Sequence, residues 1–272
     1  MKVKKSLAAR VYRGAANAVE PMLPRGLRTP AHYLSRRLTH RLEAEYDAIM
    51  AMVKPGQVAV DVGANIGVFT YGFLSHGADV VAIEPQAGCA AQIRAFYDMG
   101  FPRGSSPRRG VLDLRVEALG ERAGTAVIHV PLKDGKLDDE SASLEPDEGG
   151  GDSVTFEVPL RPLDEYGLDN VHIIKMDVEG SELSALAGAA ATIARWKPSM
   201  LIEVEQRHHK EGIDEVFARI HEIIGPRYTT SFLGQDNLFR PLSEFDVERD
   251  QLALRENPLA RGYVRNFFFL PR

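Results

Sequence analysis

Short apolar runs alternate with helical patterns along most of the chain, starting near residue 58. A brief, nearly continuous apolar run that ends in turn residues is typical of a strand covered on both faces. Strands that alternate with helices indicate a parallel sheet with crossover helices. The expected strands are VAVDV (58–62), DVVAIE (79–84), LRVEAL (114–119), HIIKMD (172–177) and SMLIEVE (199–205).

Three other segments have apolar residues at helical spacing. Residues 183–193 and 213–224 each predict an amphipathic helix that covers one face of the sheet. Residues 42–53 predict a third helix, which ends at Pro55-Gly56 because proline cannot continue a helix. The main domain is therefore expected to begin at residue 55.

Residues 124–160 depart from this alternation. The runs TAVIHVP and VTFEVPL predict the two strands of a β-hairpin around an acidic, glycine-rich loop at 133–153. The closing YVRNFFFLP predicts a last strand, antiparallel and at the sheet edge. The predicted fold class is α/β, with a doubly wound, mostly parallel, Rossmann-like sheet. Its domains are a basic helical N-terminal extension (1–54) and a main domain (55–272) that carries the β-hairpin insertion at about 124–160.

Charge is unevenly distributed along the chain. The 272 residues carry a net charge of −5, which argues against a nucleic-acid partner. Residues 1–41, however, contain ten Lys or Arg and one acidic residue. This basic leader predicts either a solvated helical arm on the acidic domain or a contact with an anionic membrane, an RNA or an acidic glycan.

Cysteine content and apolar run length bear on the compartment. The single cysteine, Cys89, excludes an internal disulfide and a zinc cluster. Arg10 and Arg13 interrupt the only stretch that resembles a secretory signal, and no run reaches the 18 apolar residues of a membrane span. We expect a cytoplasmic protein, with peripheral membrane contact through the basic N-terminus and homo-oligomerisation left open.

The stretch VAVDVGANIGVFT joins a strand to a helix through a glycine-rich turn, a geometry that places backbone N–H groups beside a ligand. The spacing Gly63-x-x-x-Gly67 misses the dinucleotide fingerprint and the P-loop. Asp61 would repel a phosphate but attract the ammonium and sulfonium of S-adenosylmethionine. Glu84 follows Asp61 by 23 residues, where an acidic side chain accepts hydrogen bonds from ribose hydroxyls. S-adenosylmethionine is therefore favoured over a nicotinamide cofactor.

These motifs resemble those of the FkbM-type S-adenosylmethionine-dependent methyltransferases over residues 58–270. The matching stretches are DVGANIGVFT, AIEP, VEALGERAG, IIKMDVEGSELSALAGA, MLIEVE and NFFFLP. The resemblance implies a class I methyltransferase fold with a seven-stranded sheet, and methylation of a hydroxyl oxygen on a sugar, glycan or secondary metabolite. It implies a cofactor site made of Asp61, Gly63, Ala64, Asn65, Gly67, Glu84, Pro85, Glu117, Ala118, Leu119 and Asp177.

Several ionisable residues follow the fourth and fifth strands, where the ligand crevice of a doubly wound sheet lies. The candidate catalytic residues are Asp177, Lys175, Glu205 and His208. Asp177 is the expected proton acceptor, assisted by Glu205 or His208, and Lys175 orders the carboxylates.

Other interpretations of these residues stay open. Asp177, Glu203 and Glu205 could instead bind a divalent ion such as Mg²⁺, although the version without metal is preferred. Structural interpretations make Lys175 the ion-pair partner of a strand-end glutamate, Asp177 a helix-entry residue and His208 part of a surface loop.

Two alternative functions also stay open, namely a catalytically inactive cofactor-binding scaffold and a nucleic-acid methyltransferase. The second is disfavoured because the fourth strand ends in DVEG and not in a Pro-Pro-Tyr type of pocket. The sequence does not identify the methyl acceptor.

Overall fold

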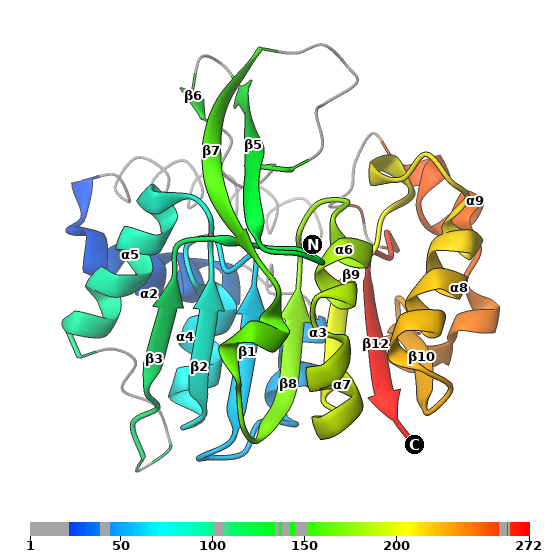
Figure 1. Ribbon diagram of the computed structural model, residues 1–272, viewed down its shortest axis with the longest axis horizontal. Coiled ribbons are helices and arrows are strands. Elements are labelled where there is room, and N and C mark those ends of the chain that lie inside the picture. The colour runs from blue at the N-terminus through cyan, green and yellow to red at the C-terminus, as the bar shows by residue number, and fades with distance from the viewer. Residues whose placement is uncertain are drawn as a thin grey trace, which may run out of the picture.

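The computed structural model describes residues 22–38, 44–100, 106, 108–133, 136–137, 142–144, 152–255, 260 and 262–272. These residues form an α/β fold in which helices cover both faces of one large sheet and a second, smaller sheet rises from its upper edge (Figure 1). The first half of the basic leader and most of the acidic loop lie outside the described residues.

The large sheet has the strand order β11-β10-β12-β9-β8-β1-β2-β3. Strands β3, β2, β1, β8 and β9 run parallel, as the alternation of strands and helices predicted. The bounds are β1 (Val58–Val62), β2 (Asp79–Ile83), β3 (Leu112–Arg115), β8 (Val171–Met176), β9 (Ser199–Glu203), β10 (Tyr228–Leu233), β11 (Phe239–Pro241) and β12 (Asn266–Pro271).

Two predictions about this sheet were wrong. It has eight strands among the described residues and not seven, because the short β11 pairs with β10. The last strand, β12, is antiparallel as expected, but it lies between β9 and β10 and not at the edge. Its three consecutive phenylalanines, Phe267 to Phe269, are fully buried, because the two apolar clusters of the core cover both faces of the strand.

The predicted strand at 114–119 is two strands in two sheets. Its first part belongs to β3, whereas β4 (Ala118–Leu119) pairs with β7 (Ser153–Arg161) in the smaller sheet. That sheet has the order β4-β7-β5-β6, with β5 (Gly124–Lys133) and β6 (Lys136–Leu137). Strands β5 and β7 form the predicted antiparallel hairpin, which stands above the carboxyl ends of the large sheet (Figure 1).

Two apolar clusters show which helices cover each face. One joins Phe73 and Ile93 to Val80 of the sheet, and the other joins Leu186 to Val60. The first face carries α3 (Ala44–Met50), α4 (Val68–Ser75) and α5 (Ala87–Asp98), and the second carries α6 (Glu182–Ala187), α7 (Ala190–Trp196) and α8 (Ile213–Ile224). Remaining helical segments are α2 (Arg25–Leu38), α9 (Val247–Asp250), η3 (Leu163–Tyr166), η4 (Gln206–His208), η5 (Leu242–Glu244) and η6 (Leu252–Leu254).

The predicted helix at 183–193 is interrupted between α6 and α7. A Cβ atom at Gly188 would lie 2.1 Å from a neighbouring carbonyl oxygen, so the chain passes close to other backbone there. The carboxylate of Asp164 then accepts hydrogen bonds from the backbone N–H groups of Ala191 and Thr192 (2.9 and 2.7 Å). A second helix start therefore replaces a continuous helix.

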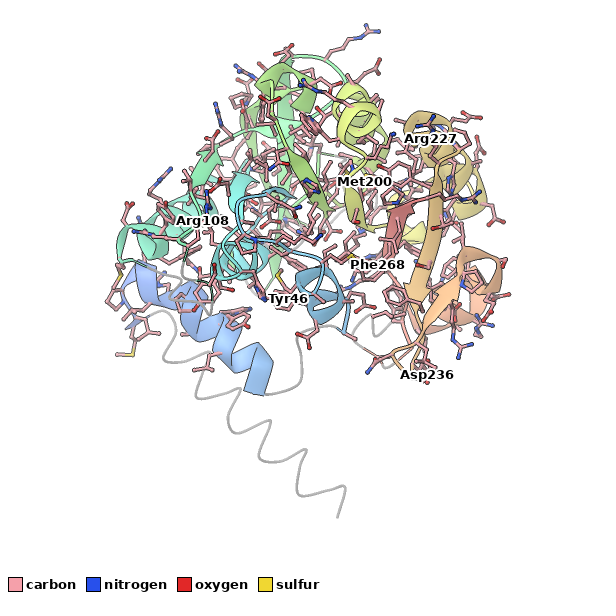
Figure 2. All side chains as sticks on the ribbon, turned by 90° about the horizontal axis from the view of Figure 1, so that it is seen from below. Tyr46, Arg108, Met200, Arg227, Asp236 and Phe268 are labelled. Carbon is pink, nitrogen blue, oxygen red and sulfur yellow. The ribbon has the colours of Figure 1, made fainter. Side chains whose placement is uncertain are left out.

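The described part of the N-terminal extension supports the glycine-rich turn from behind. Helix α2 packs on α4 and α5, and Thr29 Oγ1 donates a hydrogen bond to the carbonyl oxygen of Ile66 (2.5 Å). Figure 2 shows the same molecule from below, with Met200 and Phe268 as fully buried side chains of the large sheet. Within the described ranges, none of the helices has the length and apolar character needed to cross a membrane. The domain division at residue 55 stays a prediction.

Candidate active site

One pocket lies at the carboxyl ends of β1, β2 and β8, beneath the hairpin. Its empty volume is about 620 Å³, which includes space open to solvent. Its lining residues are Val62, Gly63, Asn65, Ile83, Glu84, Pro85, Gln86, Glu117, Ala118, Leu119, Ile128, Ala142, Leu144, Asp177, Val178, Glu179 and Ser181. Eight of the eleven cofactor residues implied by the family resemblance are among them, and Asp61, Ala64 and Gly67 are the exceptions.

The glycine-rich turn depends on two glycines for different reasons. Gly63 has a positive φ of 66°, and a Cβ atom there would lie 1.8 Å from the carbonyl oxygen of Asp177. Gly67 has a φ of 86°, and a Cβ atom there would lie 2.8 Å from Ile93 and 2.9 Å from Phe96 of α5. Gly63 therefore borders the pocket, whereas Gly67 serves helix packing and is not among the described pocket residues.

Asp61 is completely buried and does not line the pocket formed by the described residues. Its carboxylate accepts a hydrogen bond from Thr70 (2.5 Å) and pairs with Lys175 at 3.6 Å. Burial raises the pKa of Asp61, and Lys175 and Thr70 oppose that shift. The expected direct attraction between Asp61 and the cofactor is replaced by a structural role. Ala64 likewise contributes its backbone, donating to the carbonyl oxygen of Ile83 (3.1 Å).

Lys175 connects the turn to the end of β8. Its ammonium donates to the carbonyl oxygen of Gly63 (2.8 Å) and lies 3.6 Å from both Asp61 and Asp177. Burial lowers the pKa of Lys175, but Asp177 and Asp61 outweigh burial and the net shift is upward. The expected partner was a strand-end glutamate; the ion-pair partners are these two aspartates.

Glu84 directly follows β2, and its carboxylate can accept hydrogen bonds from hydroxyl groups. Its two carboxylate oxygens accept hydrogen bonds from the backbone N–H groups of Asn65 (2.7 Å) and Gln86 (2.8 Å). Burial raises the pKa of Glu84 to about 7. The carboxylate faces the pocket with its remaining lone pairs, the arrangement that ribose hydroxyls need.

The side of the pocket beyond Glu84 is mostly apolar. Ala118 and Leu119 line it, together with Glu117, whose carboxylate is held by the hydroxyl of Tyr166 (2.5 Å) and by Arg161 (3.6 Å). The hairpin adds three apolar residues, Ile128, Ala142 and Leu144. A purine ring would find cover there.

Three carboxylates meet beside the polar end of the pocket. Oxygen atoms of Asp177, Glu179 and Glu203 lie within 4.8 Å of one another, and we call these residues the carboxylate cluster. Each has a cationic partner, namely Lys175 for Asp177, Arg265 at 3.6 Å for Glu203, and a histidine for Glu179. Burial and the nearby Asp177 raise the pKa of Glu203 well above its ordinary value.

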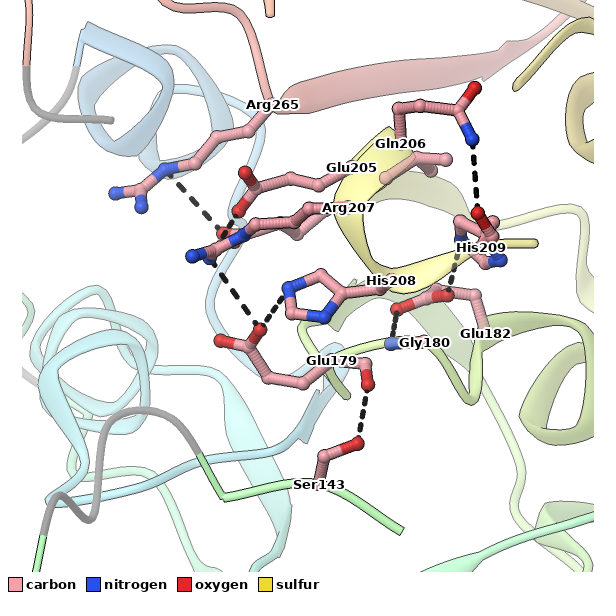
Figure 3. A network of polar contacts seen from close by, with 12 residues as sticks. Ser143, Glu179, Gly180, Glu182, Glu205, Gln206, Arg207, His208, His209 and Arg265 are labelled. Carbon is pink, nitrogen blue, oxygen red and sulfur yellow. Dashed lines mark hydrogen bonds and ion pairs between the residues drawn. The ribbon is translucent and has the colours of Figure 1, made fainter. Parts of the chain in front are cut away.

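His208 pairs with Glu179 and not with Asp177, at 2.5 Å between Nε2 and a carboxylate oxygen (Figure 3). Its side chain is only 22% exposed, so it is not part of an open surface loop. Arg207 lies 3.7 Å from the same carboxylate. Burial raises the pKa of Glu179, and Glu179 raises the pKa of His208 against the effect of burial.

Glu205 is held away from the pocket. Its side chain has no exposure, Arg207 donates to it at 2.8 Å, and Tyr263 donates its hydroxyl to the other oxygen. The pKa of Glu205 is lowered, because hydrogen bonds from Glu203 and Tyr263 and the charge of Arg207 outweigh burial. Glu205 is therefore unsuited to both of its expected roles, which were to assist Asp177 in accepting a proton and to bind a metal ion.

A second histidine stabilises the same loop. His209 Nε2 lies 3.2 Å from Glu182, whose other oxygen accepts a hydrogen bond from the backbone N–H of Gly180 (2.9 Å). Figure 3 shows the two neighbouring histidines, His208 and His209, beside Glu179 and Glu182. They hold the turn in which Glu179 and Gly180 have positive φ angles of 48° and 102°.

Sequence reasoning missed three notable pocket residues and gave a fourth no role. Glu179, the fourth, was expected beside Asp177 at the end of the fourth strand and lies in the DVEGSE block that resembles the family most closely. Ile128, Ala142 and Leu144 had no usable signal, since the pattern predicted a hairpin without showing where it folds.

Fold and site together define a class I, S-adenosylmethionine-dependent methyltransferase. The glycine cradle at Gly63 and the buried acceptor Glu84 fit that cofactor. A family model, the methyltransferase FkbM domain, matches residues 61–240. The chain belongs to this family.

The chain is similar to several solved structures. The methyltransferase FkbM from Methylobacillus flagellatus KT has a TM-score of 0.50 at 19% identity, covering 94% of this chain and 58% of that chain. The chain thus spans less than two thirds of that protein's length. Magnesium protoporphyrin IX methyltransferase from Synechocystis PCC 6803, with bound SAM, has a TM-score of 0.44 at 10% identity, with coverages of 84% and 78%. SMU.1697c, a putative methyltransferase from Streptococcus mutans in complex with SAH, has a TM-score of 0.43 at 12% identity, with coverages of 84% and 96%. No curated protein matches the chain.

Proposed function

We propose that this methyltransferase acts on a hydroxyl oxygen, with Asp177 as the proton acceptor. One observation carries the proposal: the carboxylate of Asp177, 35% exposed, lines the same pocket as Gly63 and Glu84. An ordinary alcohol is a poor nucleophile near neutral pH, so a base within reach of its proton accelerates the reaction.

The cofactor, when bound, supplies a methyl group on a sulfonium that an acceptor oxygen can displace in line. The chain then has to hold the acceptor oxygen and remove its proton. Good positioning alone can lower a barrier by roughly 7–11 kcal/mol. Lys175, 3.6 Å from Asp177, limits the movement of that carboxylate.

Among the carboxylates near the pocket, Asp177 suits proton acceptance best. Glu203 is buried and pairs with Arg265, and Glu205 is enclosed by Arg207 and Tyr263. Glu179 lines the pocket but is already paired with His208. His208 thus acts on the site through Glu179, as a positioning residue.

We also propose that the reaction needs no divalent ion. Metal sites rich in carboxylates carry excess negative charge that the ion neutralises. Here Lys175, Arg265 and Arg207 already provide that neutralisation for the carboxylate cluster.

The acceptor class rests on the family resemblance, which favours a hydroxyl on a sugar, glycan or secondary metabolite. The test is to incubate the protein with deuterated-methyl S-adenosylmethionine and an extract of cells that lack it. Mass spectrometry then identifies molecules that gain a deuterated methyl group, and fragmentation locates it. Labelled RNA or DNA, or a methyl group on nitrogen or carbon, would contradict the proposal.

The role of Asp177 is tested with Asp177→Asn. We expect the affinity for S-adenosylhomocysteine to be unchanged and labelling of the acceptor to fall by at least about a hundredfold. Asp169→Asn is the matched control, because Asp169 lies before the opposite end of β8 and is 75% exposed. Full labelling by Asp177→Asn would remove Asp177 from the mechanism.

A further inference from the structure

Part of the pocket wall comes from the hairpin insertion. Ile128 of β5 and the segment 142–144, through Ala142 and Leu144, line the pocket. These side chains belong to one apolar cluster with Ala118 and Val158. The insertion therefore packs on Ala118, which also lines the pocket.

The pocket wall has two kinds of surface. Gly63, Asn65, Glu84 and Asp177 present backbone and polar groups. Ala118 and the side chains of the insertion present a small, aliphatic surface and belong to one cluster. S-adenosylmethionine likewise has a charged amino-acid part and a flat purine. Apolar cover favours the purine, and the hydroxyls of the intervening ribose then face Glu84.

The segment 142–144 is attached at two points. Ser143 and His129 exchange backbone hydrogen bonds of 2.8 and 3.0 Å, which joins the segment to β5. The hydroxyl of Ser143 donates to the carbonyl oxygen of Glu179 at 2.6 Å (Figure 3). The segment therefore bridges the hairpin and the loop that carries the carboxylate cluster.

We propose that Ile128, Ala142 and Leu144 form the outer wall of the purine site, so that the insertion is part of the cofactor-binding machinery. This inference rests on the chain using S-adenosylmethionine. Because Ser143 bonds to Glu179, the wall formed by the insertion and the loop that carries the carboxylate cluster are held in one arrangement. A bound nucleoside therefore stabilises both.

The test is Leu144→Ala, with binding of S-adenosylhomocysteine and of methylthioadenosine measured by calorimetry. Methylthioadenosine keeps the nucleoside and lacks the amino-acid part. We expect both affinities to fall by a similar factor of about ten, because three apolar carbons are removed from the wall. Leu144→Met, which conserves volume, should restore most of the affinity.

Val127→Ala is the control on the same hairpin. Val127 neighbours Ile128 in β5, so its side chain points to the opposite face, where it is 43% exposed. Both affinities should stay at the wild-type values.

The outcomes separate this inference from the assignment of the cofactor. If the wild-type protein binds neither compound, the cofactor assignment fails. If it binds both and Leu144→Ala binds equally well, only the wall is overturned. A loss confined to S-adenosylhomocysteine would place Leu144 at the amino-acid part and overturn the purine assignment. A loss that Leu144→Met shares fully would also overturn it, because side-chain volume would not be the cause.

Discussion

Replacing Gly63 by alanine should disrupt the cofactor site more than any other single methyl group added to the glycine-rich turn. The new Cβ atom would lie 1.8 Å from the carbonyl oxygen of Asp177 and 2.9 Å from its carbonyl carbon. Both atoms belong to backbone at the end of β8, so no side-chain rotation relieves the overlap. The φ angle of 66° is an additional obstacle for any residue with a Cβ atom.

The magnitude follows from these two terms. Left-handed backbone costs roughly 1–2 kcal/mol for an L-residue, and forcing an extra carbon into a packed site costs typically about 1–3 kcal/mol. We therefore expect the free energy of unfolding to fall by about 2–5 kcal/mol for Gly63→Ala. The ends of β1 and β8 must separate, which moves Asn65 from Glu84, so the affinity for S-adenosylhomocysteine should fall at least about tenfold.

Gly88→Ala is the matched control, measured by urea unfolding and calorimetry. Gly88 lies in α5, and a Cβ atom there would meet no described atom within 4 Å. Alanine is favoured in helices by roughly 0.5–1 kcal/mol, so this variant should be as stable as the wild type or slightly more so. Its affinity for S-adenosylhomocysteine should not change. Wild-type stability and affinity in Gly63→Ala would refute the close approach of the turn to β8.

Three further outcomes are expected. The affinity for S-adenosylhomocysteine should weaken as the pH falls below about 7, by up to about tenfold per pH unit. The reason is that the carboxylate of Glu84 accepts hydrogen bonds from the ribose hydroxyls and has a pKa of about 7. Calorimetry across this pH range checks the prediction, and Glu84→Gln should bind weakly with no pH dependence. Lys175→Met should lower the free energy of unfolding by roughly 3–5 kcal/mol, because the buried Asp61 carboxylate loses its cationic partner. Urea unfolding measures this loss, and the double variant with Asp61→Asn should recover part of it. Methyl transfer should persist in EDTA because the carboxylate cluster is already neutralised, and a loss that Mg²⁺ restores would contradict that.

The parts of the fold that local pattern controls were predictable. Strand β1 occupies residues 58–62, as the apolar run indicated, and β8 and β9 differ from their predicted bounds only at the ends. Gly63, Asn65 and Glu84 line the pocket because their positions follow from strand ends in a parallel sheet. The spacing of apolar residues and the residue types of a turn involve only residues close together in the chain, so a single sequence is enough to read them.

The parts that depend on distant segments were not predictable. Nothing near β12 reveals that β10 and β11 lie outside it, because a run of phenylalanines has the same appearance at an edge and in the interior. The place of Leu144 in the pocket wall depends on how the whole insertion folds back. Glu205 was chosen from strand period alone, and its partner Tyr263 lies 58 residues further along the chain.

Asp61 shows why a residue type at a strand end does not by itself identify a ligand contact. Its negative charge is neutralised by Lys175, and the ammonium of Lys175 also bonds the carbonyl oxygen of Gly63 and pairs with Asp177. One buried lysine therefore positions the cofactor turn and the proposed proton acceptor relative to each other. Asp61 keeps that lysine charged and in place, since an unpaired charge at this depth would be too costly to retain. Asp61 therefore helps to maintain the backbone geometry of the glycine-rich turn.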